Sequence, residues 1–454
     1  MTLHDIGFTT RLKRAILDRG DRALVFLGNF EVEEQWAHGE CTLPRLTSPG
    51  STAVVNRMDE FALLLGGADD HVILKAAPDA GYLDHLRAVG FSLPTVHAVA
   101  AQNPQRTVTQ DALADERLLK RLAELAAEGA YLSAHGVSTV EENLGAAAGI
   151  PLAAPDAATC KAVNGKVYSR RIADELGIRQ PIGWSSTTVA ELADAVAAAE
   201  RLVDDGRTVV LKEAYGVSGK GIAVIDRSSR LRRLERMVAA QAAKSGAAVS
   251  FVIEEWVTKL ADLNYQFTVS RDGDVHFDFV KTALTEQGVH KGHRLPADLP
   301  AEHVETIRQT AELLGRRLAA DGYHGVVGVD AIVEGDGGLF PMLEINARNN
   351  MSTYQTALQE RLMGDGHVAL ARHYPVRLTE RIDFAAVERR LDGVLLPAPT
   401  GEGLVVTNFA TVNAGSVGSG PFDGRLYAFL VADTDDRLAE LDRSISERLD
   451  GDVR

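Results

Sequence analysis

The stretch GVVGVDAIVEGDGGLFPMLEIN, residues 325–346, constrains the fold more than any other part of the chain. Two apolar runs flank a glycine-rich turn at 335–338, a pattern that is typical of a buried β-hairpin. Asp330 interrupts the first run, while Glu344 and Asn346 interrupt the second and share one face of their strand. Acids in apolar surroundings are costly unless they are paired or bind a metal, and hard oxygen ligands suit Mg²⁺. The hairpin therefore predicts a magnesium site, with solvated strand carboxylates as the alternative.

A second constraint is the run KEAYGVSGKGIAV at residues 212–224, which places a lysine inside a glycine-rich loop. A P-loop needs Ser or Thr directly after its lysine, followed by a helix. Here Gly221 follows Lys220 and the strand-like IAVID comes next, so the P-loop interpretation fails. A glycine loop between two strands can instead fold over a triphosphate and offer it backbone N–H groups. Lys212, at the end of an apolar strand, favours an anion nearby, while a flexible hairpin tip is the alternative.

Two further patterns fit a nucleotide. The apolar strand FVIEEWV at 251–257 can offer extended backbone to an adenine edge, with Trp256 and Val257 packing beside it. A plain core strand is the alternative. Arg348 follows Asn346 by two residues, and its permanently charged guanidinium suits the geometry of a phosphate.

Composition limits the class of protein. A chain of 454 residues is too long for one ordinary core, so two or three domains are expected. The formal net charge of −15 argues against a nucleic-acid surface. The two cysteines, Cys41 and Cys160, have no metal-ligand spacing, and no apolar run has the length of a signal peptide or membrane span. We therefore expect a cytoplasmic protein that binds neither nucleic acid nor membrane.

The order of predicted elements gives a domain organisation. Residues 1–153 alternate between strands and helices, which predicts a small α/β domain with a parallel sheet. No G-x-G-x-x-G follows its first strand, so a Rossmann oxidoreductase is disfavoured. Residues 154–375 hold the motifs above and begin with one expected helix over 161–177, and 376–454 form a small α+β domain.

Together these motifs resemble the ATP-grasp superfamily of carboxylate–amine ligases over roughly residues 154–371. The likeness rests on motif order: Lys166, the strand lysine with its glycine loop, the acidic strand before Val257, Asp330, and E-x-N-x-R. The glycine loop looks like that of glycinamide ribonucleotide synthetases. The overall layout is similar to the pheganomycin-type peptide ligases of natural-product pathways. The resemblance implies an ATP-grasp fold preceded by a small α/β pre-ATP-grasp domain and followed by a small α+β domain.

The resemblance also implies ATP and Mg²⁺ as cofactors and assigns residues to them. The ATP set is Lys166, Lys212, Gly216, Ser218, Gly219, Lys220, Gly221, Glu254, Glu255, Trp256 and Val257, with either Asp262 or Asn264 for the ribose. The metal set is Asp330, Glu344 and Asn346. The catalytic set is Arg348, Lys281 and Lys212.

The implied reaction is ADP-forming ligation through an acyl phosphate. A small carboxylic acid or amino acid is activated, and the amine of an amino acid or peptide attacks it. The expected substrate contacts are Arg294, Asn349, Asn350 and Ser352. Arg294 belongs to the basic segment VHKGHRLP, for which a solvated loop is the alternative. An ATP-grasp kinase of a small polyol and a non-catalytic ATP-binding scaffold stay open as alternatives, and so does a homodimer.

Overall fold

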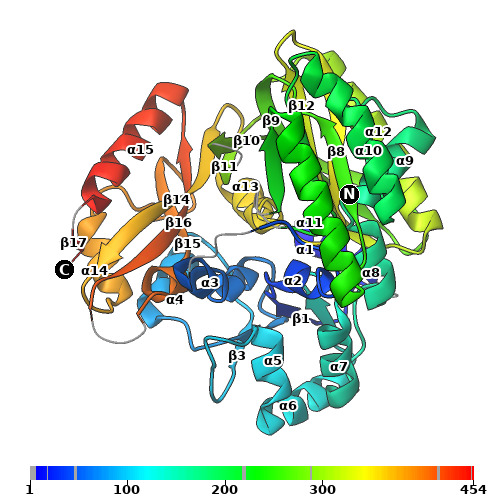
Figure 1. Ribbon diagram of the computed structural model, residues 1–454. Helices are drawn as coiled ribbons and strands as arrows, with labels where there is room; N and C mark the ends of the chain where they lie inside the picture. Colours follow the sequence, from blue (N-terminus) through cyan, green and yellow to red (C-terminus); the bar gives the residue numbers. More distant parts are fainter. Residues whose placement is uncertain are drawn as a thin grey trace.

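The computed structural model describes residues 7–17, 19–44, 49–216, 221–286, 289–416, 420–450 and 452–453. Within these ranges the strands form three sheets, arranged around the centre of the molecule (Figure 1). No helix in the described part of the chain is long and apolar enough to cross a membrane.

The N-terminal region is a parallel α/β layer, as the sequence predicts. Its elements are α1 (Phe8–Ile16), β1 (Leu24–Leu27), α2 (Val32–Trp36), α3 (Pro49–Val55), the 3₁₀ helix η2 (Met58–Leu64), β2 (His71–Leu74), α4 (Ala80–Ala88), β3 (Thr95–Ala98), α5 (Val108–Leu113), α6 (Glu116–Ala127), β4 (Tyr131–Ala134) and α7 (Thr139–Ala148). The strand order is β3-β2-β1-β4, with every pair parallel. Local signals fix the helix starts: Thr107 and Ser138 each form a capping box.

The middle region forms a small antiparallel sheet covered by helices. Its elements are α8 (Ala157–Val163), α9 (Lys166–Leu176), β5 (Gly183–Ser186), α10 (Val189–Asp204), β6 (Val209–Glu213), β7 (Ile222–Ile225), α11 (Ser228–Ser245) and β8 (Phe251–Glu255). The strand order is β5-β8-β6-β7, and α10 and α11 lie across one face (Figure 1).

The expectation of one helix over 161–177 is wrong, because the chain breaks between α8 and α9. Asn164 ends α8, and its side chain donates hydrogen bonds to the carbonyls of Cys160 (2.7 Å) and Ala347 (3.0 Å). Gly165 then has extended backbone at the N-cap of α9. The break puts Lys166 at the first position of a new helix rather than in the middle of a longer one.

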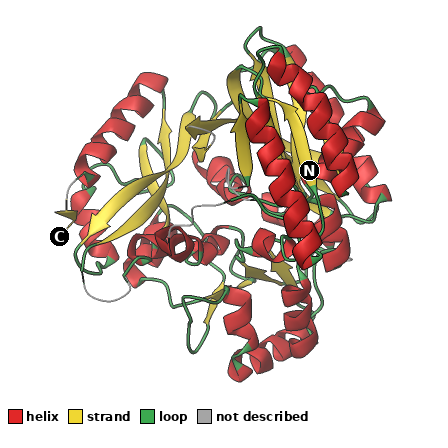
Figure 2. Ribbon diagram, in the orientation of Figure 1, coloured by secondary structure: helices red, strands yellow, loops and turns green. Residues whose placement is uncertain are grey.

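The third sheet runs through both the middle and the C-terminal parts of the chain. Its elements and neighbours are β9 (Lys259–Val269), β10 (Val275–Glu286), β11 (Val289–Leu295), α12 (Ala301–Ala320), β12 (Gly325–Glu334), β13 (Leu339–Asn346), η3 (Thr353–Gln355), α13 (Thr356–Leu362), β14 (Val368–Leu378), α14 (Phe384–Arg390), β15 (Gly403–Asn408), η4 (Ala410–Asn413), β16 (Phe422–Ala432), α15 (Asp435–Leu449) and β17 (Asp452–Val453). The strand order is β13-β12-β9-β10-β11-β14-β16-β15, with β17 beside β14. Helix α12 packs on one half of this sheet and α15 on the other (Figure 2).

Strand β11 makes this sheet continuous. The segment VHKGHRLP, for which a solvated loop was the alternative interpretation, forms β11 and pairs with β10 on one side and β14 on the other. Strand β14 also runs across the predicted boundary between residues 375 and 376, where the sequence suggested that a separate C-terminal domain begins. The predicted mixed α/β and α+β fold class is nevertheless confirmed.

Candidate active site

The three sheets surround one cavity of about 660 Å³. The predicted site residues that line it are Lys166, Lys212, Gly216, Glu254, Glu255, Trp256, Val257, Asp262, Asn264, Asp330, Glu344, Asn346, Arg348 and Asn350. Those that do not line it are Gly221, Lys281, Arg294, Asn349 and Ser352. The predicted loop residues Ser218, Gly219 and Lys220 lie outside the described residues.

The two acids of the predicted magnesium site face each other across the hairpin. Asp330 on β12 lies directly opposite Glu344 on β13. The Asp330 carboxylate accepts hydrogen bonds from Asn264 (2.9 Å) and Asn346 (3.3 Å). Burial, followed by repulsion from Glu344, raises the pKa of Asp330 to about 6. Two facing carboxylates whose charges repel are a donor set that a divalent cation would stabilise.

The described residues contain no cluster of three or more His, Cys, Asp or Glu that could hold a metal by itself. A cation between Asp330 and Glu344 therefore needs the Asn346 amide and further oxygen ligands. Nucleotide phosphates and water commonly provide such ligands to Mg²⁺. The residues present thus fit a nucleotide-bound magnesium ion better than a free structural one.

Lys166 and Lys212 reach the cavity from different elements, and each is paired with an acid. Lys166 Nζ lies 2.6 Å from Glu344 Oε1, and Lys212 on β6 pairs with Glu254 on β8. Burial alone would lower the pKa of the Lys166 ammonium, but the attraction of Glu344 and Glu33 raises it above its ordinary value. Two ammonium groups, each paired with a carboxylate, therefore line the cavity.

Arg348 is the third cation. Its guanidinium donates to Asn346 Oδ1 (2.9 Å) and pairs with Glu33 on α2. Glu33 comes from the N-terminal region, and sequence reasoning missed it because EVEEQW carries no recognisable motif. The buried His135, which follows β4, also lines the cavity and was missed; its Nδ1 lies 2.8 Å from the Tyr354 hydroxyl. These contacts bring the N-terminal region into the site.

The end of β8 and the two residues after it, which the sequence predicts beside an adenine, line the cavity. The Trp256 backbone N–H donates to Thr208 O (2.8 Å), and its side chain is 40% exposed at the cavity mouth. Glu255 pairs with Arg207 at 3.1 Å. Of the two ribose candidates, Asn264 is engaged at both ends, because its amide donates to Asp330 and its carbonyl accepts from Ser352 (2.6 Å).

Lys281 lies behind the cavity wall. It is fully buried, its ammonium donates to Ser352 O (3.1 Å) and Gln355 Oε1 (3.2 Å), and it sits 3.9 Å from the centre of the Phe279 ring. Burial lowers its pKa well below the ordinary value. Ser352 in turn contacts Asn350 and Asn264. Lys281 thus supports the residues behind the metal strands without reaching the cavity itself.

Two of the predicted substrate residues have other partners. Arg294 pairs with Asp435 at the start of α15 (2.5 Å) and donates to Pro296 O (3.1 Å). The backbone N–H of Asn349 donates to His135 O at 2.9 Å. The structure therefore uses these residues to join chain segments beside the cavity.

The comparisons with known proteins agree with this geometry. A family model described as a pre-ATP-grasp domain matches residues 58–150, and a model described as an ATP-grasp domain matches residues 169–352. The chain belongs to the ATP-grasp superfamily. The matched ATP-grasp segment contains Lys212, Asp330, Glu344 and Arg348.

Two curated relatives of this ATP-grasp protein are named as ligases. It is 28% identical over 392 residues to an L-propargylglycine–L-glutamate ligase of Streptantibioticus cattleyicolor, covering 76% of this chain and 79% of the relative. It is 26% identical over 328 residues to a [butirosin acyl-carrier protein]–L-glutamate ligase of Niallia circulans, covering 71% of each. Among solved structures, the ADP complex of an N5-carboxyaminoimidazole ribonucleotide synthetase has a TM-score of 0.53 at 14% identity, covering 95% of this chain and 98% of the other. That last likeness shows the fold alone.

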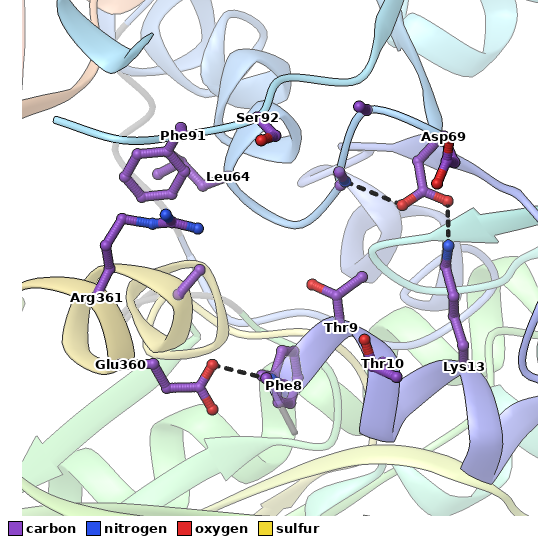
Figure 3. Close-up of a pocket in the computed structure, with 16 residues that line it drawn as sticks. Phe8, Thr9, Thr10, Lys13, Leu64, Asp69, Phe91, Ser92, Glu360 and Arg361 are labelled. Atoms are coloured by element: carbon purple, nitrogen blue, oxygen red, sulfur yellow. Dashed lines mark hydrogen bonds and ion pairs between the residues drawn. The ribbon is translucent and has the colours of Figure 1, made fainter. Parts of the chain in front are cut away.

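A second hollow in this ATP-grasp protein lies apart from these motifs (Figure 3). It has a volume of about 500 Å³ and lies between α1, the end of α13 and the turns around Gly67 and Phe91. Several of its charged groups already have partners: Lys13 pairs with Asp70 at 2.6 Å, and Glu360 accepts from the Phe8 backbone N–H at 2.9 Å. None of the residues predicted for ATP or magnesium lines this hollow.

Proposed function

We propose that this ATP-grasp ligase activates the carboxylate of a small acid or amino acid as an acyl phosphate and joins it to the amine of an amino acid or peptide. The observation that carries the proposal is the facing pair Asp330 and Glu344, in a cavity that three cations also line. Phosphoryl transfer depends chiefly on positioning and charge neutralisation, and this set of residues supplies both.

We assign the metal, the phosphates and the ribose to different residues of the cavity. Asp330, Glu344 and Asn346 would hold a magnesium ion, which would supply neutralisation of phosphate charge. Glu344 could bind the metal through its second carboxylate oxygen while Oε1 keeps its pair with Lys166. Arg348 stabilises the charge that develops at the transferred phosphoryl group. Either Asp262 or Asn264 would hold the ribose, and both already have partners: Asp262 accepts from Lys259 (2.6 Å) and Thr285, and Asn264 is engaged at both ends.

The relatives suggest which substrate to test first. L-glutamate is named in both ligase relatives described above. We propose L-glutamate as one of the two partners, within a natural-product pathway in the cytoplasm. We expect cavity residues outside the ATP-grasp motifs to select the substrates. A screen of amines and acids would identify the substrate that is joined to L-glutamate.

The test uses hydroxylamine, which captures an acyl phosphate as a hydroxamate. The full-length protein is incubated with Mg-ATP, hydroxylamine and L-glutamate or other amino acids, and both ADP and hydroxamate are measured. We expect equal amounts of the two for at least one acid. ADP release driven by polyols without any hydroxamate would favour the kinase alternative, and no turnover with any mixture would favour the scaffold.

The variant pair Glu344→Gln and Glu334→Gln provides the control. Glu344 faces Asp330, whereas Glu334 lies at the end of β12 and pairs with Arg179 outside the cavity. Glu344→Gln should lower kcat by about 100-fold or more, the scale seen when a single stabilising group is lost from a transition state. Glu334→Gln should retain normal turnover. Equal losses in both variants would contradict the assignment.

A further inference from the structure

The cavity extends beyond the metal strands to a wall formed by β14 and β16. His373 on β14 lies directly opposite Tyr427 on β16, so their side chains share one face of the sheet. Arg425 lies two residues before Tyr427 and points to the same face. All three residues line the cavity.

The residue before His373 on β14, Arg372, also lines the cavity, but its guanidinium already has a carboxylate partner. Arg372 and Tyr374 point toward α15, where Asp442 accepts hydrogen bonds from the Arg372 guanidinium (2.8 Å) and the Tyr374 hydroxyl (2.6 Å). Side chains alternate between the two faces along each strand. Arg372, which has a carboxylate partner, and Arg425 therefore point to opposite faces of the sheet.

Arg425 differs from the cations at the nucleotide end. Lys166, Lys212 and Arg348 each have a carboxylate partner. Over the described ranges, Arg425 forms no ion pair with an acid. It is only half-buried, so its guanidinium can meet a small anion entering from the cavity.

The surroundings of Arg425 favour an anion. Burial first, and then the nearby charges of Arg425, Lys291 and Arg372, lower the pKa of His373 to about 4. Among the described residues of the C-terminal part that line the cavity, from Ala371 to Ala428, none is an acid. We call the end of the cavity formed by His373, Arg425 and Tyr427 the Arg425 lobe. Its positive charge contrasts with the net charge of −15 of the whole chain.

Between this lobe and the nucleotide end lies an aromatic wall. The Phe61 ring on η2 is 5.0 Å from the Tyr427 ring in an edge-on arrangement and 5.7 Å from the Tyr354 ring. Met58 and Phe30 line the same stretch. An apolar substrate segment that lies along this wall would join the two ends of the cavity.

The proposed chemistry makes such a lobe useful. An amino acid or peptide that supplies an amine also carries a carboxylate of its own, which must be kept away from the phosphoryl group. We propose that Arg425, with His373 beside it, binds the free carboxylate of the amine-supplying amino acid or peptide, whose apolar part lies along Phe61 and Tyr427. This assignment rests on the proposed ligase function and names the substrate class for its second site.

Binding of simple probes tests the assignment without turnover. The probes are L-alanine, L-leucine, L-phenylalanine and L-alanyl-L-leucine, each as the free acid and as its C-terminal amide. The Tm of the full-length protein is measured with each probe in the presence of Mg-ADP, which allows no phosphoryl transfer. We expect at least one free acid to raise the Tm of the wild type while its amide does not.

Three variants locate the effect. Arg425→Gln should weaken binding of that free acid by about tenfold to 100-fold, the range for a lost charged hydrogen bond. Arg425→Lys should keep part of the affinity. Arg377→Gln, which removes an exposed β14 arginine that pairs with Asp423 at 3.0 Å, should bind like the wild type. The Tm without probe shows whether each variant is folded.

The outcomes separate this assignment from the proposed function. Equal binding by the wild type and Arg425→Gln would overturn the assignment, and so would a wild type whose Tm no free acid shifts. Arg425-dependent binding without any hydroxamate would instead support the lobe and contradict the ligase reaction. When turnover is found, Arg425→Gln should raise KM for the amine substrate and leave KM for ATP unchanged.

Discussion

Arg348, just after β13, pairs with Glu33 on α2, so a carboxylate from the pre-ATP-grasp region faces the arginine predicted for phosphoryl transfer. The contact joins two regions that are separate in sequence. It also places a negative charge beside a cation that we propose attracts phosphate.

Glu33→Gln should tighten nucleotide binding. The variant keeps a hydrogen-bond acceptor for Arg348 but removes the opposing charge, and opposite charges a few ångströms apart near a protein surface interact by a few kcal/mol. We expect the Kd for Mg-ADP, measured calorimetrically, to fall by about tenfold. Unchanged or weaker binding would show that Glu33 orients Arg348 without reducing its attraction for phosphate.

Gly221→Ala should impair the nucleotide site more than a matched glycine substitution elsewhere. Gly221 and Gly206 have nearly equal φ values of +82° and +83°. A side chain in this conformation costs about 1 kcal/mol at either position. A Cβ at Gly221 would lie 2.6 Å from a Glu213 carboxylate oxygen, whereas one at Gly206 would meet nothing within 4 Å.

We therefore expect Gly221→Ala to lose more free energy of unfolding than Gly206→Ala. Only Gly221→Ala should raise KM for ATP. Urea unfolding and steady-state kinetics measure the two effects. Equal behaviour of the two variants would separate Gly221 from the nucleotide loop.

Glu60 should make stability depend on pH. Its buried carboxylate on η2 accepts from the backbone N–H groups of Phe409 (2.6 Å) and Ala410 (2.7 Å). Burial raises its pKa from 4.5 to about 7. Between these values the unfolded chain ionises while the folded chain keeps the proton, so the free energy of unfolding should fall as pH rises from 4.5 toward 7.

The slope from this one group is at most about 1.4 kcal/mol per pH unit. Glu60→Gln should remove that part of the slope, whereas the exposed Glu380→Gln should leave it intact. Urea unfolding at several pH values gives the comparison. If the free energy of unfolding has the same pH slope in the wild type and in Glu60→Gln, the Glu60 carboxyl is not protonated in the folded protein.

Lys281→Met should leave nucleotide binding unchanged, in contrast to Lys212→Met. Lys281 contacts Ser352 and Gln355 behind the cavity wall, whereas Lys212 lines the cavity. Loss of a charged hydrogen bond to phosphate should weaken Mg-ADP binding by Lys212→Met about tenfold to 100-fold. A similar loss in Lys281→Met would restore the direct role that the sequence suggested.

The sequence identifies residues that share the cavity where one element carries them. Asp330 and Glu344 come from one hairpin, and Lys212 precedes a recognisable glycine run. Their spacing in the sequence is therefore enough to place them in motifs. Glu33, His135 and Arg425 escaped prediction because tertiary packing brings them in from distant segments without a motif. The break before Lys166 was also missed, since Asn164 and Gly165 act through contacts that a single-helix pattern does not reveal.

The pairing of β11 with β14 has a consequence for motion. Backbone hydrogen bonds join the strands that carry Asp330 and Glu344 to those that carry His373 and Arg425, so these four residues belong to one stiff body. Lys212 and Glu254 lie on a separate sheet that shares no strand pairing with this body among the described residues. We therefore expect that a domain movement closing over a nucleotide moves the sheet that carries Lys212. The distance between the metal strands and Arg425 should stay nearly constant during that movement.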